Sequence, residues 1–178
     1  MHRMNTGKFI YASILGLILF ASDYCLADAS NGIVGFWKTI NESTQKPECI
    51  VAIYQYGKEY YGRIIVTYND DGSVQDTIYQ PRKRAVGIVG NPYYAGLDII
   101  WGLKAGNNKY INGSIVDPLK GNIYGAEAWR QGNSLIVKGK LFIFWRNQTW
   151  PVATDTDFPS DFQKPDLTAL VPVIPKTI

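Results

Sequence analysis

The sequence of 178 residues is poor in the side chains that most often carry catalysis and metal binding. It has one histidine, His2, and two cysteines, Cys25 and Cys49. His2 and Cys25 fall in the first 27 residues, which we interpret below as a leader. Without them the chain has no imidazole for acid–base or metal chemistry and no second thiol for an internal disulfide. We therefore expect no metal, no cofactor and no enzymatic activity, and we expect Cys49 to be a buried apolar side chain.

Charge of either sign is also scarce. Removal of the leader takes away Arg3, Lys8 and Asp23, which leaves 16 basic and 14 acidic residues. This balance does not favour a nucleic-acid partner. The basic run at 82–84 (Arg-Lys-Arg) is either a solvated loop or a contact for anionic lipid headgroups or glycans.

The first 27 residues have the features of a secretory signal peptide. Arg3 and Lys8 precede an apolar run over 9–21, and Cys25-Leu26-Ala27 places small residues where a signal peptidase cleaves. The run of about 13 residues is shorter than the ~20 that span a bilayer. We expect cleavage after Ala27, export to the periplasm and no transmembrane helix in the mature chain. The alternatives are secretion, a lipid anchor on Cys25 and a retained membrane anchor.

Aromatic and β-branched residues punctuated by glycine indicate a β-protein after the leader. Short apolar segments separated by turn residues predict strands at 34–40, 49–56, 60–68, 97–103, 110–116, 123–129, 135–143 and 144–150, with a weak strand at 74–79. Alternation places Leu97, Ile99, Trp101 and Leu103 on one face of their strand. No segment has helical periodicity long enough to predict a helix.

Consecutive strands with short turns favour an antiparallel up-and-down β-barrel of about eight strands over residues 28–150. A β-sandwich is the alternative, but sandwiches need long crossover connections and only the segment 80–96 is long enough. Five prolines follow Trp150, so residues 151–178 are expected to be an extended tail that either wraps the barrel or stays mobile.

Three passages carry a resemblance to a known family. They are Gly35-Phe36-Trp37, then the segment 60–65 (Tyr-Tyr-Gly-Arg-Ile-Ile), and then 96–104 leading into 113–124 (Gly-Ser-Ile-Val-Asp-Pro-Leu-Lys-Gly-Asn-Ile-Tyr). Over residues 35–150 the chain resembles DUF2147, an uncharacterised family of exported bacterial proteins with a lipocalin-like fold. The resemblance implies that Trp37, after Gly35, closes one end of the barrel beneath a basic residue from a late strand. By position that residue is Arg146.

The last of these passages also has a physical interpretation. Asp117 can accept hydrogen bonds within a turn, Pro118 sets the φ that a turn needs, and Gly121 can take a positive φ. Tyr124 then faces a neighbouring strand. We expect a hairpin that fixes strand register, with a ligand-binding edge as the alternative.

The main functional hypothesis is a barrel that binds a small hydrophobic or amphipathic ligand. The loop 81–96, with Tyr93 and Tyr94, would be its lid, and Trp101, Tyr110 and Trp129 would line the site. The alternative is an envelope interaction or structural protein whose barrel is filled by side chains. An enzyme would have to use carboxylates such as Asp98 and Glu127, and we consider it the least favoured class.

Overall fold

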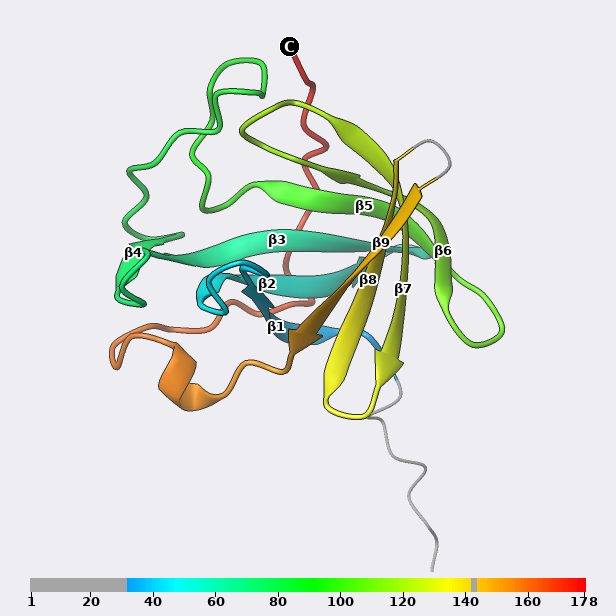
Figure 1. Ribbon diagram of the computed structural model, residues 1–178, viewed down its shortest axis with the longest axis horizontal. Helices are drawn as coiled ribbons and strands as arrows, with labels where there is room; N and C mark the ends of the chain where they lie inside the picture. Colours follow the sequence, from blue (N-terminus) through cyan, green and yellow to red (C-terminus); the bar gives the residue numbers. More distant parts are fainter. Residues whose placement is uncertain (1–31, 142–143) are drawn as a thin grey trace, which may run out of the picture.

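The structure, a computed structural model, describes residues 32–141 and 144–178. The predicted leader, with its cleavage site and Cys25, lies outside the described residues. The regular secondary structure of the described chain is β-strand, apart from one 3₁₀ turn at Asp155–Asp157 (Figure 1). Its strands are β1 (Gly35–Ile40), β2 (Pro47–Tyr56), β3 (Glu59–Tyr68), β4 (Val74–Thr77), β5 (Asp98–Ala105), β6 (Tyr110–Val116), β7 (Ile123–Gln131), β8 (Ser134–Leu141) and β9 (Phe144–Pro151).

The strands form one antiparallel sheet in the order β1-β2-β3-β5-β6-β7-β8-β9, and β4 pairs with β3 outside this path. The sheet curls until its two edges meet. Trp37 bridges Val152, and the Ala153 amide donates to the Phe36 carbonyl at 2.9 Å. The predicted antiparallel up-and-down barrel is therefore confirmed, and it is nearly closed.

Strand β5 departs from the predicted alternation. Its pairing with β3 slips between Gly62 and Arg63, where Gly62 lies opposite Ile100 and Arg63 lies opposite Asp98. Consecutive Ile99 and Ile100 are both buried as a result, whereas Trp101 is only partly buried. A β-bulge inserts one residue into a strand, so the side chains after it change face. Strict alternation of inward and outward residues does not predict such a change.

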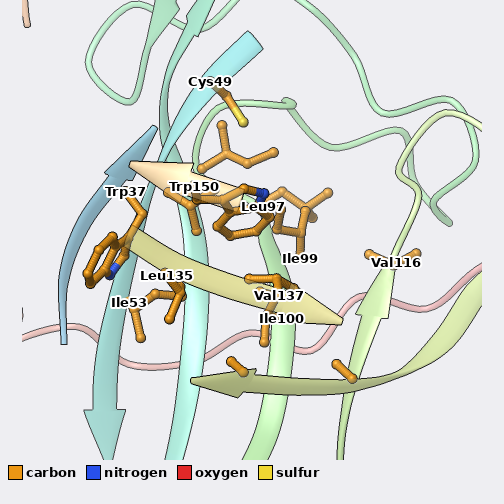
Figure 2. Close-up of a cluster of buried hydrophobic side chains, with 14 of the residues drawn as sticks. Trp37, Cys49, Ile53, Leu97, Ile99, Ile100, Val116, Leu135, Val137 and Trp150 are labelled. Atoms are coloured by element: carbon orange, nitrogen blue, oxygen red, sulfur yellow. The ribbon is translucent and has the colours of Figure 1, made fainter. Parts of the chain in front are cut away.

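A large apolar cluster lies in the barrel interior. Trp150 lies in its middle, between Trp37 on one side and Cys49 and Leu97 on the other (Figure 2). Every strand of the closed path contributes at least one residue, and β9 contributes Trp150. The buried members are Ile33, Trp37, Cys49, Val51, Ile53, Ile64, Ala85, Ile88, Leu97, Ile99, Ile100, Leu103, Val116, Ala126, Ala128, Leu135, Val137 and Trp150.

A second apolar cluster lies outside the barrel, under the C-terminal tail. Phe158 stacks on Phe162 with ring centroids 5.5 Å apart and meets Phe36 edge-to-face at 5.8 Å. These rings and Leu167 cover the outer face of β2 and β3, where Ile50, Ala52, Ile65 and Val66 are buried. The tail is thus a third layer on this wall, and it continues behind β2 and β3 to the top of the molecule in Figure 1.

A polar clamp holds the tail farther along. Asp98 is buried and accepts hydrogen bonds from Arg63 at 2.7 Å, from the Tyr54 hydroxyl at 2.9 Å and from the Val173 amide at 2.7 Å. Arg63 also donates to the Val171 carbonyl at 2.7 Å. Burial, followed by the charge of Asp98, raises the pKa of Tyr54 well above its usual value. The clamp thus gives hydrogen-bond partners to the buried Asp98 carboxylate and to the Val171 carbonyl and Val173 amide of the tail.

Candidate functional site

One end of the barrel is covered by the long connection between β4 and β5, which we call the lid loop (residues 80–97). Ala85, Ile88 and Leu97 of this loop are buried in the interior cluster next to Cys49 and Val116. Tyr94 packs against the same cluster, and burial raises the pKa of its hydroxyl above the usual value. The lid loop is therefore part of the core at this end, which we call the lid end.

The lid loop is fastened to the turn between β6 and β7. The Gly87 amide donates to the Pro118 carbonyl at 3.0 Å. A Cβ on Gly87 would lie 2.3 Å from the Gly121 amide nitrogen, so only glycine allows this approach. The turn itself is as its sequence predicts: Asp117 Oδ1 accepts from the Leu119 amide at 3.0 Å, and Gly121 has a φ of 72°.

The C-terminal segment holds the lid loop from another side. Ile88 bridges Thr177, and the Val89 amide donates to the Lys176 carbonyl at 2.8 Å. Figure 1 shows the C-terminus, this loop and the β6–β7 turn together at the top of the molecule. The lid loop is thus held between two segments that are distant from it in sequence.

The opposite end is closed by Trp37, whose indole Nε1 donates to the Ile33 carbonyl at 2.8 Å. The guanidinium of Arg130 lies 5.6 Å from the centre of the Trp37 ring. The expected stacking partner, Arg146, is instead bound to Glu42 at the lid end, where their hydrogen bond lowers the pKa of Glu42. Arg130 takes the stacking place because it pairs with Leu135 near the end of β7 that adjoins Trp37.

The inner wall formed by β7 and β8 is lined by small residues toward the lid end. Ala126 pairs with Gly139, and Ala128 pairs with Val137, all on the inward face. Among the described side chains, a Cβ on Gly139 would meet only Ile115 Cγ2, at 4.0 Å. By contrast, a Cβ on Gly62 would lie 2.9 Å from Ile53, so the space beside that glycine is filled.

Polar groups stand at the mouth of this small-residue wall. The ladder puts Arg146 opposite Gly139 and Gln148 opposite Val137, on the inward face of β9. Tyr124 lies opposite Ile115, where β6 and β7 reach the lid end. The wall thus combines small residues with polar groups on the same face: the Arg146 guanidinium is paired with Glu42, and the Gln148 amide oxygen accepts from the Trp150 indole at 3.1 Å.

The sequence places this barrel in a family. Residues 35–151 match the family model described as "Uncharacterized protein conserved in bacteria (DUF2147)". The chain belongs to DUF2147. No curated protein matches it. Among solved structures it is similar to HP1028, a protein of the human pathogen Helicobacter pylori described as belonging to the lipocalin family. That similarity has a TM-score of 0.57 and 18% identity, and it covers 72% of this chain and 87% of that one. It shows that this DUF2147 barrel shares the lipocalin fold.

Of the five predicted ligand-lining aromatics, Tyr94, Trp101 and Tyr110 pack against the interior cluster, whereas Tyr93 and Trp129 do not. Tyr93 is exposed, with the guanidinium of Arg84 stacked 3.6 Å from its ring centre, while Tyr94 packs inward. Tyr110 contacts Tyr60 edge-to-face at 4.6 Å on the inner wall, and Trp101 is partly buried against the interior cluster. Of the five, only Tyr94 lies on the underside of the lid loop.

Trp129 lies on the outer face of the DUF2147 barrel. Ala126 and Ala128 are buried inside, so the alternate residues Glu127 and Trp129 face outward. Together they line an open surface hollow of about 590 Å³ with Lys109, Ile111, Lys138 and the β5–β6 turn. The sequence alone could have predicted this position. Trp129 is two residues after the charged Glu127, so the two side chains lie on the same face of the strand.

The two carboxylates considered for catalysis are both engaged. Asp98 is held by Arg63, Tyr54 and the tail, as described above, and Glu127 accepts from Lys109 at 2.7 Å. Cys49 is buried, and burial raises the pKa of its thiol to about 12. Within the described residues, no three histidine, cysteine or acidic side chains gather as metal ligands. No helix in this part of the chain is long and apolar enough to cross a membrane.

Proposed function

We propose that this DUF2147 protein is an exported, non-enzymatic carrier that binds one small hydrophobic or amphipathic molecule inside its barrel. The observation that supports the proposal is the difference between inner walls: a Cβ on Gly62 would collide with Ile53, whereas a Cβ on Gly139 would only touch Ile115 Cγ2, at 4.0 Å, among the described side chains. A barrel of about eight strands holds either its own side chains or one small ligand. The apolar part of the ligand would lie against Ala126 and Gly139, with its polar end toward Gln148 and Arg146.

Export is supported by the leader and by the lone buried Cys49 of the mature chain. A protein with no second thiol neither gains nor loses an internal disulfide in an oxidising compartment. A non-enzymatic role is supported by the two candidate carboxylates, because Asp98 and Glu127 both already accept hydrogen bonds from other residues of the protein.

Native mass spectrometry of the protein purified from its own envelope, without delipidation, tests this proposal. We expect a discrete added mass that disappears on denaturation. The variant Gly139→Leu adds a bulky side chain to this inner wall and should lose this mass while remaining folded. Trp129→Ala, which changes a tryptophan on the outer face, is the control and should retain it.

A second candidate function is an envelope interaction protein with a side-chain-filled barrel. The observation that favours it is the central position of Trp150, which with Trp37, Leu135 and Val137 fills the interior near one end. A clean apo mass that does not change after incubation with an envelope lipid extract would favour this alternative over the carrier.

A further inference from the structure

Exposed apolar side chains gather on the outer surface of the lid end. The lid loop contributes Val86 and Val89, with 57% and 56% of their surfaces exposed. The β6–β7 turn contributes Leu119, and the C-terminal segment contributes Ile174 and Ile178, all of them exposed. We call these five residues the lid patch. An exposed apolar patch of this kind marks an interaction site more often than scattered single residues do.

The lid patch is preformed, because backbone hydrogen bonds join the segments that carry it. The Gly87 amide reaches Pro118, next to Leu119, and the Val89 amide reaches Lys176, two residues from Ile178. The Ile178 amide itself donates to the Gly87 carbonyl at 3.3 Å. A surface held in this way is already ordered, so binding to it costs little conformational entropy.

Unneutralised cations surround the lid patch. Arg84, Lys120 and Lys176 are exposed, and no described carboxylate lies within ion-pair distance of them. At the opposite end, Lys104 pairs with Glu59 at 3.4 Å and Lys109 pairs with Glu127 at 2.7 Å. The acidic side chain of the β6–β7 turn, Asp117, accepts hydrogen bonds from the Leu119 and Lys120 amides. No salt bridge therefore cancels the charge of these three cations, although the Arg84 guanidinium also stacks on Tyr93.

We propose that the lid patch docks the protein on the surface of an anionic lipid bilayer. Apolar tips that enter the headgroup region, ringed by lysine and arginine that attract anionic headgroups, are the two components of peripheral membrane binding. Docking in this orientation places the lid loop, and the barrel end that it covers, against the lipid. The proposal concerns the outside of the lid and does not require a ligand inside, so its failure would leave the carrier proposal standing.

Vesicle co-sedimentation of the chain that begins at Asp28 tests the docking. The probes are vesicles of phosphatidylcholine alone and of equal parts phosphatidylcholine and phosphatidylglycerol. We expect binding to the anionic vesicles that weakens as salt is raised. Each basic residue near an anionic membrane surface increases the binding affinity about fivefold. The combined variant R84Q/K120Q/K176Q should therefore bind about a hundredfold more weakly.

Two matched variants separate docking from general attraction between opposite charges. K58Q/K104Q/K109Q removes the same charge from the opposite end and should bind within about twofold of the unchanged protein. V86S/V89S keeps every charge and should bind at least about tenfold more weakly, because it removes the apolar tips. Circular dichroism verifies that each variant is folded. No binding to anionic vesicles, an equal loss in the two charge variants, or unchanged binding of V86S/V89S would each overturn the proposal.

Discussion

The walls formed by β2 and by β7 differ in how many layers cover them. In β2 all six residues from Cys49 to Tyr54 are buried. In β7 only Ala126 and Ala128 are buried, and the alternate residues Glu127 and Trp129 face outward. The cause is the tail, which packs Phe158 and Phe162 on the outside of β2 and β3 but does not reach β7. An unbroken apolar strand in an antiparallel barrel therefore indicates a covering layer outside the sheet.

The largest effect should come from removing that layer. Truncation after Ala153 takes away Phe158, Phe162 and Leu167 and exposes the outer face of β2 and β3. Burial of each such side chain is worth about 1.5–3 kcal/mol, so we expect a loss of about 5 kcal/mol or more in the free energy of unfolding, measured by urea denaturation. If the truncated chain does not fold, Phe158→Ala gives the graded version, with a loss of about 3 kcal/mol. An unchanged urea midpoint in both variants would show that the tail is not a structural layer.

The next effect compares Asp98, which starts β5 and binds Tyr54 and Arg63 of the covered wall, with Glu127 of β7. Asp98→Asn leaves Arg63 partly buried without its counter-charge and weakens the clamp on Val173. We expect it to cost about 3 kcal/mol of stability. Glu127→Gln breaks the more exposed pair with Lys109 and should cost less than about 1 kcal/mol. Thermal or urea unfolding of both variants measures the difference, and equal losses would contradict the layered description of the two walls.

A smaller effect should follow from loosening the lid loop. In Gly87→Ala the new Cβ collides with the Gly121 backbone, and we expect a loss of about 1–3 kcal/mol. Hydrogen–deuterium exchange should rise across residues 85–97 before it rises in β7 and β8. Gly32→Ala, whose Cβ would meet nothing within 4 Å, is the matched control and should change neither quantity.

The smallest effect concerns pH. Burial alone would raise the pKa of Asp157, but hydrogen bonds from Lys38 and Thr154 outweigh it, so the pKa lies below its ordinary value of 3.8. A lowered pKa stabilises the fold fully above the ordinary value, and the stabilisation is lost as pH falls through the lowered value. We expect Asp157→Asn to cost about 1 kcal/mol or less at neutral pH and nothing at pH well below the lowered pKa. A difference between the two proteins that persists in acid would disprove this.

Local patterns were sufficient to predict the strands and the barrel. Gly57, Gly72 and Gly132, all with positive φ, mark the turns between apolar segments, and Asp117-Pro118 with Gly121 builds the turn that its residue types require. The chemistry of these turns is contained within a few neighbouring residues, so the sequence is enough to predict it.

Contacts between distant segments could not be predicted in the same way. The clamp on Asp98 depends on the tail reaching Val173, and the stacking of Arg130 rather than Arg146 on Trp37 depends on which end of β7 adjoins β1. The bulges in β5 also moved Ile100 inward. In each case the structure depends on how residues far apart in the chain pack together. The local pattern of apolar and polar residues carries no information about such contacts.

The hold of the C-terminal segment on the lid loop sets an order of events during biosynthesis. Val89 is made before the strands β5 to β9, whereas its backbone partner Lys176 is made after all of them. The barrel can therefore form with its lid loop held only by the β6–β7 turn, through Gly87 and Pro118, and the second hold is added when the last residues of the chain arrive.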